Sequence, residues 1–194
     1  MDISYFGQAL VPLLENTAFI VIAILLLCSM KRFRKMLAAD SSMKEKAFAG
    51  LVFGLLAIYG TLSAKSVEGA LLNVRDLAPV AGGFLGGPVV GIVAGLLGGA
   101  QRLSMGGFTA VPCALATLVA GTAAGLLAER IRGKYFILKA AAIAAFLELF
   151  HMGLILLIAQ PFEKASILVE KIAAPMAVAN ALGIACALCL AGKK

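Results

Sequence analysis

Long apolar segments, separated by short polar clusters, constrain this chain more than any other feature of its sequence. A helix needs about 20 predominantly apolar residues to cross a bilayer core that is about 30 Å thick. Segments of roughly this kind run over residues 5–30, 47–64, 77–100, 109–128, 135–159 and 172–191. The sequence therefore predicts an all-α integral membrane protein, a polytopic helical bundle of six to seven segments.

Composition and charge support a membrane location. Apolar residues make up 62% of the 194 residues and charged residues only 14%, about half the charged share of a soluble domain. The first apolar segment is too long for a signal peptide, and its basic cluster follows it, so we expect a retained helix. The net charge of +7 lies mainly in short loops, where basic residues set topology and contact head groups. We therefore expect membrane lipid, and no nucleic acid, as a partner.

The distribution of basic residues predicts the topology. Residues 31–46 contain six Lys or Arg, residues 130–139 contain four, and two lysines occupy positions 193 and 194. The positive-inside rule places all three groups on the cytoplasmic face. Six single crossings would put the second basic loop opposite the first, whereas two passes through residues 77–100 restore agreement. We therefore expect an external N-terminus, a cytoplasmic C-terminus and seven segments, two of them short.

The segment over residues 77–100 is expected to be broken in its middle. Proline in a helix interior costs about 3 kcal/mol, which favours two short helices that meet near Gly87 and Pro88. Ten of the 21 glycines fall within residues 82–107, and glycine recurs at every fourth position from Gly83 to Gly99. Such a stripe allows close helix packing. Non-helical backbone at membrane depth must be buried in protein or line a cavity, so the break also indicates a binding site.

Polar residues on both sides of this break are candidates for binding a ligand: Asn73, Arg75, Arg102, Ser104, Thr109 and Cys113. They are expected to converge at the external end. Two guanidinium groups, together with the free N–H groups at the start of the next helix, suit a small carboxylate. Alternatives remain open, because Arg75 could pair with Asp76 at the membrane interface, Arg102 could extend to lipid head groups and Cys113 could merely pack.

Other polar residues at membrane depth are expected to face the protein interior. Glu148 and His151 are three residues apart and hence lie on one helix face. We expect a buried pair, with a response to pH or a conformational signal as alternatives. All four cysteines lie in apolar segments, so no disulfide, metal site or cofactor is expected, and the C-x-x-C formed by Cys186 and Cys189 is interpreted as packing.

Four motifs in the central region carry a family resemblance: N-V-R-D from Asn73, G-G-F-L-G-G-P-V-V-G from Gly82, G-L-L-G-G-A-Q-R from Gly95 and G-G-F-T-A-V-P-C from Gly106. In order and spacing they resemble the membrane input domain of LytS-type sensor histidine kinases, a five-transmembrane receptor module. The resemblance runs from about residue 47 onward. It implies an N-terminal transmembrane helix and basic cytoplasmic loop over residues 1–45 and a receptor domain over residues 46–194.

The resemblance also implies a function. A domain of this type receives a signal in a bacterial inner (plasma) membrane as a homodimer and passes it to a cytoplasmic histidine kinase of a two-component system. Some family members sense external pyruvate, and others are tied to cell-wall organisation. In the pyruvate-sensing members the implicated residues correspond to Arg75, Arg102 and Cys113. The expected ligand is therefore a small extracellular carboxylate such as pyruvate.

Two further expectations concern what this chain does by itself. The last apolar segment leads directly to Lys194, so we expect no catalysis in this chain, although a full-length parent would be a histidine kinase. The family is also similar to the substrate-binding membrane subunits of energy-coupling-factor transporters. A solute-binding component of a transporter is therefore the alternative function, and a purely structural membrane protein is a third possibility that would leave Arg102 without a role.

Overall fold

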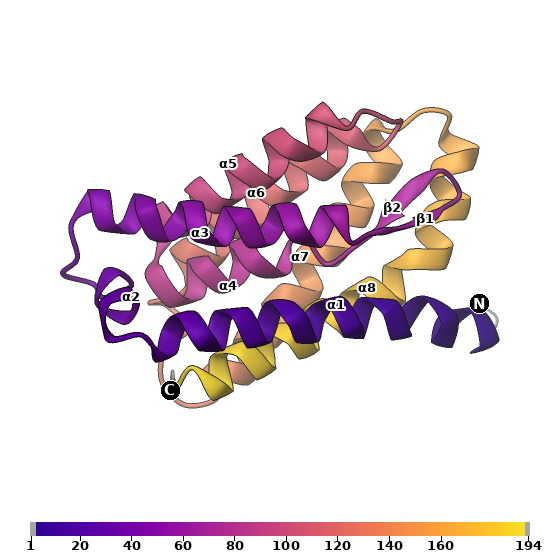
Figure 1. The fold of residues 1–194 in the computed structure, drawn as a ribbon. Coiled ribbons are helices and arrows are strands. Elements are labelled where there is room, and N and C mark those ends of the chain that lie inside the picture. The colour runs from indigo at the N-terminus through magenta and orange to yellow at the C-terminus, as the bar shows by residue number, and fades with distance from the viewer. Residues whose placement is uncertain (1–2, 193–194) are drawn as a thin grey trace.

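The computed structural model describes residues 3–192, which form eight helices and a two-stranded hairpin (Figure 1). Five of these helices (α1, α3, α6, α7 and α8) are long and apolar enough to cross a membrane. The predicted all-α polytopic bundle is therefore confirmed. The elements are α1 (Ile3–Ser29), α2 (Lys31–Met36), α3 (Met43–Leu62), β1 (Lys65–Val67), β2 (Ala70–Leu72), α4 (Leu77–Gly86), α5 (Pro88–Ser104), α6 (Ala110–Leu127), α7 (Phe136–Ile158) and α8 (Phe162–Leu190).

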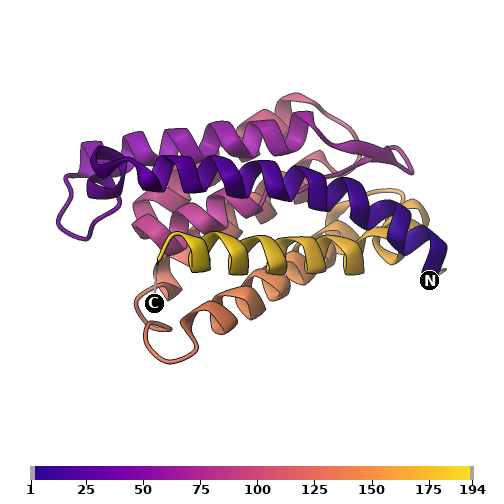
Figure 2. The same cartoon turned by 60° about the horizontal axis from the view of Figure 1, so that its bottom comes forward.

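The bundle has two distinct ends. One end carries the β1–β2 hairpin and the α5–α6 and α7–α8 connections, and we call it the hairpin end (Figure 1). The opposite end, which we call the basic end, carries α2, the α6–α7 connection and the end of α8, as a second view also shows (Figure 2). The basic loops at residues 31–46 and 130–139 thus lie at the same end. The two basic loops share one end because α4 and α5 cross the bundle in opposite directions, which are the two passes expected from residues 77–100.

The expected break in the central apolar segment is present. Helix α4 ends at Gly86 and α5 begins at Pro88, and between them Gly87 adopts a φ of +87° in the left-handed region. Pro88 occupies the first turn of α5, where its missing N–H has no helical acceptor to lose. All ten residues of α4 are buried, and α4 packs against α3, α5, α6 and α8. The break itself, however, lies at the basic end, where Gly87 is half-buried, Pro88 is exposed and the neighbouring Gly86 lies beside Leu37. It connects two helices at that end and is not irregular backbone at membrane depth, so it does not itself mark a binding site.

The glycine stripe brings α5 against the backbone of α6. A Cβ atom added to Gly91 would overlap the carbonyl oxygen of Gly121, and one added to Gly95 would lie 2.9 Å from Leu118 Cα. Gly99 meets the α6 backbone in the same way. No side chain separates the two helices along this face, so the end of α5 and the start of α6 lie close together at the hairpin end.

Three short features were not predicted from the sequence. Helix α8 begins at Phe162 and not near residue 172, and its first turns pack beside the hairpin, where the Lys171 ammonium donates to Glu68. The hairpin turn has positive φ at Glu68 (51°) and Gly69 (74°), as a two-residue type I′ turn requires. Strands of three residues and the six-residue α2 are too short to produce a periodic sequence pattern.

Acid is expected to loosen this hairpin. The hydrogen bond and charge of Lys171 lower the pKa of the Glu68 carboxyl below its usual value. A carboxyl with a lowered pKa in the folded state adds stability above its ordinary pKa and loses that contribution as pH falls through the lowered value. Amide exchange of the hairpin, corrected for its intrinsic pH dependence, should therefore accelerate at acidic pH in the natural protein but not in Glu68→Gln. Equal pH profiles for the two proteins would contradict this role, and Glu163→Gln serves as a control.

Candidate functional site

Arg75 lies on a buried loop that leads from β2 into α4. The Asn73 side chain accepts a hydrogen bond from the Arg75 backbone N–H (3.0 Å) and donates to the Leu71 carbonyl oxygen (2.7 Å). Asparagine stabilises tight turns through such local bonds. Asn73 therefore shapes the loop, and the Arg75 side chain enters the bundle with an exposed fraction of 0%.

The Arg75 guanidinium is held by side chains of two elements. Its Nε donates to Thr117 Oγ1 (2.7 Å), and its Nη2 reaches the Cys113 carbonyl oxygen (3.5 Å). The same Nε lies 3.4 Å from Asp76 Oδ1, which also accepts a 2.5 Å hydrogen bond from the Thr117 hydroxyl. The pairing of Arg75 with Asp76 that the sequence left open therefore exists, although both residues are buried inside the bundle. Arg75 Nη1 has no hydrogen-bond partner within residues 3–192.

Arg102 turns back into the α5–α6 loop. Its Nη1 donates to the Gly106 carbonyl oxygen (2.7 Å) and its Nη2 to Thr109 Oγ1 (2.9 Å). Only 2% of its surface is exposed, so the alternative in which Arg102 extends to lipid head groups is wrong. Its Nε lacks a hydrogen-bond partner in the described part of the chain.

Ser104 is the one predicted site residue that lies away from the others. It is exposed, and its hydroxyl donates to the Gln101 carbonyl oxygen of its own helix (2.7 Å). Ser104 follows Arg102 by two residues, and residues two apart point to different sides of a helix. The structure therefore brings together five of the six predicted residues and leaves Ser104 on the surface.

The Cys113 thiol lies where the two arginines approach each other. Cys113 is buried near the start of α6, and its thiol interacts electrostatically with Arg75, Arg102 and His151. The guanidinium groups of Arg75 and Arg102 also repel each other. Two buried cations that face one thiol are costly to desolvate unless an anion joins them.

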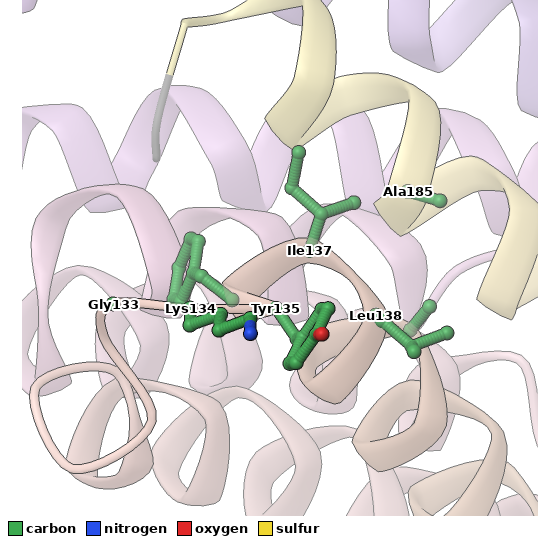
Figure 3. A pocket seen from close by; sticks show the side chains of 8 residues that line it. Gly133, Lys134, Tyr135, Ile137, Leu138 and Ala185 are labelled. Carbon is green, nitrogen blue, oxygen red and sulfur yellow. The ribbon is translucent and has the colours of Figure 1, made fainter.

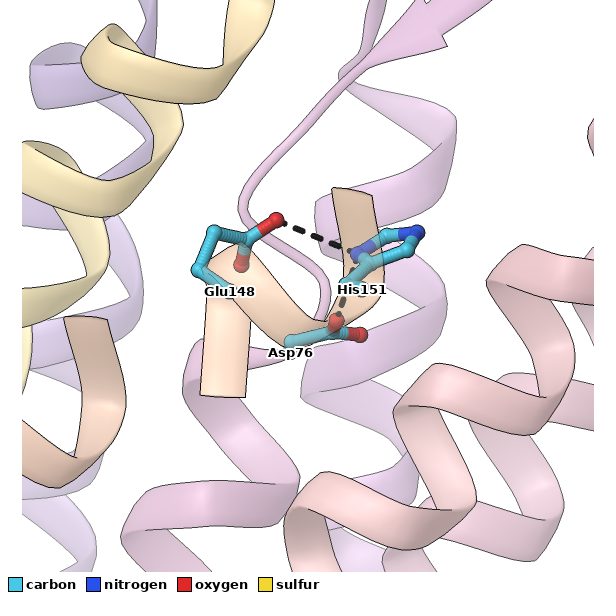
Figure 4. Close-up of side chains that lie close together, drawn as sticks. All are labelled: Asp76, Glu148 and His151. Carbon is cyan, nitrogen blue, oxygen red and sulfur yellow. Dashed lines mark hydrogen bonds and ion pairs between the residues drawn. The ribbon is translucent and has the colours of Figure 1, made fainter. Parts of the chain in front are cut away.

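A second set of buried polar side chains extends from the region of Asp76 and Cys113 toward α8. His151 Nδ1 lies 3.1 Å from Asp76 Oδ2 and 3.1 Å from Glu148 Oε1 (Figure 4). On the other side of Glu148, Asn180 Nδ2 donates to Oε2 (2.8 Å). The predicted contact of Glu148 with His151 is therefore present, but it belongs to a buried chain of four residues that links the start of α4 to α7 and α8.

Asp76, Glu148 and His151 also have the composition of a metal site, with one potential ligand atom from each within 4.8 Å of the others. The surrounding donors disfavour a divalent cation. The Arg75 guanidinium already places a positive charge 3.4 Å from Asp76, and the Asn180 amide donates to Glu148. Like charges at such distances repel strongly inside a protein. The cluster is therefore better suited to share protons among its own side chains than to hold a metal ion.

Sequence reasoning missed two members of this site. In the sequence Asp76 stands out only as a possible partner of Arg75, and Thr117 does not stand out within its apolar segment. A signal for Thr117 exists, because it lies four residues after Cys113 and therefore on the same face of α6. His151 was noted only for its spacing from Glu148, because its contact with Asp76 depends on the packing of α7 against α4.

Thr117→Val is expected to destabilise the bundle because it removes the acceptor for Arg75 Nε and the donor to Asp76. Each buried charged group left unsatisfied costs about 1–3 kcal/mol or more. The melting temperature of the detergent-solubilised protein should therefore fall clearly. Thr122→Val is the matched control, since the Thr122 hydroxyl bonds only to the Leu118 carbonyl oxygen of its own helix. Equal melting temperatures for the two variants would show that the Thr117 contacts contribute nothing.

A separate hollow of about 700 Å³ lies at the basic end (Figure 3). It opens between the start of α7 and Ala185 of α8, and its lining is largely apolar: Gly133, Lys134, Tyr135, Phe136, Ile137, Leu138, Ala141 and Ala185. Specific binding of a polar ligand needs convergent polar groups. We therefore place the candidate site at the two arginines and not in this hollow.

Comparison with known proteins agrees with the motifs. The family model described as "5TMR of 5TMR-LYT" matches residues 30–193. Sensor histidine kinase BtsS of Escherichia coli (strain K12) is 37% identical over 186 residues, which cover 93% of this chain and 33% of that protein. Sensor protein LytS of Bacillus subtilis (strain 168) is 33% identical over 198 residues, which cover 90% of this chain and 32% of that protein.

The match covers only one part of these relatives. Sensor histidine kinase YpdA of Escherichia coli (strain K12) is 35% identical over 125 residues, which cover 63% of this chain and 22% of that protein. The chain thus spans about a third of the length of BtsS and LytS. No solved structure matches it significantly. The family match, the relatives and the apolar helices together show that this chain belongs to the 5TMR-LYT family, the multi-pass membrane input domains of LytS-like sensor histidine kinases.

Proposed function

We propose that this input domain binds a small extracellular carboxylate such as pyruvate between Arg75 and Arg102, beside Cys113. The observation that carries the proposal is the pair of buried guanidinium groups, each with one donor nitrogen that lacks a partner within residues 3–192. Arginine matches carboxylate geometry well. Asp76 offsets the charge of Arg75, whereas no carboxylate of the described residues lies within ion-pair distance of Arg102. A bound carboxylate would supply the missing negative charge.

Two of the other predicted residues have supporting roles in this proposal. Thr109 fixes the direction of the Arg102 guanidinium, and Asn73 fixes the loop that carries Arg75. Both act as positioning residues. Ser104 is exposed and is not included in the proposed site.

The hairpin end is proposed to face outward and the basic end to face the cytoplasm. Support comes from the ten basic residues of the loops at residues 31–46 and 130–139, because short cytoplasmic loops carry an excess of Lys and Arg. In this orientation α1 begins on the outer side and α8 ends on the cytoplasmic side, as the sequence predicts. The candidate site then lies nearer the exterior than the cytoplasm, because Arg102 and Thr109 flank a loop of the hairpin end.

Within a full-length sensor, the proposed partners are a second copy of this domain and a cytoplasmic histidine kinase. The N-terminal helix and basic loop (residues 1–45) are proposed to precede the receptor domain proper (residues 46–194). Ligand binding would relieve the repulsion between Arg75 and Arg102 and draw the end of α5 toward the start of α4. A ligand shifts a conformational equilibrium only through different affinities for the two states, and the loss of this repulsion on closure would provide that difference.

Calorimetric titration of the detergent-purified protein tests the proposed function. Pyruvate should bind saturably, and pyruvamide, which has nearly the same shape without the negative charge, should not. The comparison isolates the carboxylate as the recognised group. Absence of pyruvate binding to protein that retains its helical circular dichroism would refute the proposal.

A further inference from the structure

The hollow at the basic end has no part in the proposed carboxylate site. It measures about 700 Å³ and opens between the first turns of α7 and Ala185 of α8 (Figure 3). Its lining contains one charged side chain, that of Lys134, and is otherwise largely apolar. A hollow of this volume is large enough to bury a small ligand or one arm of a larger one. Because water gains little from contact with apolar walls, the hollow suits an apolar chain.

The hollow lies where α7 enters the membrane. Helix α7 is one of the five candidate membrane spans, and the basic loop at residues 130–139 leads into it. Tyr135 and Leu138 line the hollow and have exposed fractions of 62% and 68%. Tyrosine is enriched where lipid head groups meet the acyl chains. We therefore place the hollow at this boundary, within reach of both parts of a lipid.

The positive charge in the lining has no counterion. The Lys134 ammonium lies 4.9 Å from the centre of the Tyr135 ring, and this cation–π contact holds it beside the hollow. Within residues 3–192 no carboxylate lies within ion-pair distance of this ammonium. The nearby Arg132, in contrast, donates to Glu129 at 2.6 Å. Lys134 is therefore the basic residue of this loop that both lines the hollow and is available to an anion.

The backbone turn before α7 adds to this positive potential. Gly133 (φ +104°) and Tyr135 (φ +65°) are both in the left-handed region, which glycine adopts freely but tyrosine adopts at a steric cost. The turn sets Lys134 beside the start of α7. The first N–H groups of a helix lack intrahelical acceptors and carry partial positive charge, and the Tyr135 side chain does not cap them.

We propose that this hollow binds one anionic phospholipid, with an acyl chain against the apolar lining and the phosphate beside Lys134. An apolar hollow next to an unpaired ammonium matches a molecule in which an apolar chain is joined to an anion. Basic pockets between transmembrane helices are suited to acidic lipid head groups. The proposal goes beyond the proposed carboxylate function and does not depend on it.

Charge argues for a lipid and against a second copy of this chain as the occupant. In a parallel dimer the basic ends of the two copies lie at the same side of the membrane. The two loops of that end, residues 31–46 and 129–139, contain ten basic and three acidic residues. A second copy would therefore bring mainly like charge to Lys134, which repels it, whereas an anionic lipid brings the missing negative charge.

Lipid binding here would link two helices near the end of α8. The start of α7 and Ala185 form opposite sides of the hollow. An acyl chain between them would stabilise one spacing of α7 and α8 over others. A lipid with this preference shifts the equilibrium between such spacings, so the composition of the membrane would influence the position of the helix that leads toward the cytoplasmic side.

Native mass spectrometry of the detergent-purified protein tests the head group. Phosphatidylglycerol and phosphatidylcholine with identical acyl chains are added separately, and the affinity for the first bound lipid is compared. One basic residue near an anionic head group contributes about fivefold in affinity, so phosphatidylglycerol should bind at least about fivefold more tightly. Lys134→Gln should remove about this factor and Lys134→Arg should keep it. Lys35→Gln, which changes an exposed lysine of α2 at the same end, should behave as wild type.

Either of two results would overturn the role of the head group. One is equal affinity of the wild-type protein for the two lipids. The other is a preference for phosphatidylglycerol that Lys134→Gln leaves unchanged. Both variants alter exposed side chains, so they should retain the fold, and helical circular dichroism checks this.

A second pair of variants tests the hollow itself. Ala141 lines the hollow and is half-buried, whereas Ala142 on the same helix is exposed and lies outside it. Ala141→Phe should fill the hollow and weaken binding of the first phosphatidylglycerol at least about tenfold, and Ala142→Phe should not. Unchanged binding in Ala141→Phe would overturn the site. The same spectra report the oligomeric state, and loss of a dimer in Ala141→Phe with unchanged lipid binding would assign the hollow to a second copy instead.

A photoreactive lipid tests the site without any substitution. Phosphatidylglycerol with a diazirine in one acyl chain is incorporated into vesicles with the wild-type protein, irradiated and located by peptide mass spectrometry. Labelling should concentrate on the start of α7 and around Ala185, and excess phosphatidylglycerol, but not phosphatidylcholine, should compete with it. Equal labelling of the exposed apolar residues of α3, such as Leu51 and Leu55, would show that lipids cover the bundle without a specific site and would overturn the proposal.

Discussion

Arg102→Ala is expected to weaken pyruvate binding by about thirtyfold to several thousandfold. Truncation of one partner of a buried, hydrogen-bonded charge pair costs about 2–5 kcal/mol, and each 1.4 kcal/mol is tenfold in affinity. The variant should remain folded, because Arg102 has no carboxylate partner among residues 3–192 and its removal leaves no buried anion exposed to an apolar environment. Titration calorimetry and the melting temperature, measured on the same preparation, check both parts of this expectation.

Two further variants separate recognition from general effects of charge. Arg102→Lys keeps the positive charge but loses the paired N–H groups, so pyruvate affinity should fall between wild type and Arg102→Ala. Arg130→Ala removes an exposed arginine at the basic end and should bind as wild type. If Arg102→Ala instead unfolded while Arg102→Lys bound pyruvate normally, Arg102 would be a structural residue.

Gly91→Ala is expected to separate α5 from α6 and to lower the melting temperature strongly. The added methyl group would overlap the Gly121 carbonyl oxygen, and backbone cannot move aside as a flexible side chain can. Overpacking in a well-packed interior costs about 1–3 kcal/mol and occasionally more. Because α5 carries Arg102 and α6 carries Cys113, the displaced helices should also bind pyruvate more weakly. Differential scanning fluorimetry in detergent and calorimetric titration measure the two effects.

Gly153→Ala is the matched control for this prediction. A Cβ atom added to Gly153 in α7 would have no atom of the described residues within 4 Å, apart from its chain neighbours and the nearby backbone of its own helix. Alanine is also more favourable than glycine in a helix by about 1 kcal/mol. This variant should melt at the same or a higher temperature. If Gly91→Ala melted no lower than Gly153→Ala, the contact between the α5 and α6 backbones would not be essential.

The helices and the central break could be predicted because their signals are local. Apolar length marks the spanning helices, and the Gly87–Pro88 step ends one helix and starts the next. The start of α8 could not be placed, since its first turns contain charged residues that are stabilised beside the hairpin by the contact of Lys171 with Glu68. Short elements such as α2 have no periodic pattern of their own.

The candidate site was predictable only where its residues flank the break in sequence. Arg75, Arg102 and Cys113 lie in motifs around that break, so their convergence could be inferred. His151 and Asn180 reach the same region from α7 and α8, and only tertiary packing brings them there. Ser104 shows the opposite error, because proximity in sequence to Arg102 does not place a residue on the same helix face.

The proposed function depends most directly on contact between a bound carboxylate and buried arginine side chains. Dipolar coupling in solid-state NMR between pyruvate labelled with carbon-13 at its carboxylate and nitrogen-15 labelled arginine side chains measures this contact in the membrane-embedded protein. We expect the carboxylate carbon to lie within hydrogen-bonding range of guanidinium nitrogens in the wild-type protein, with the coupling lost in Arg102→Ala. Pyruvate that binds saturably without such a coupling, or with one that persists in Arg102→Ala and in Arg75→Ala, would contradict the account.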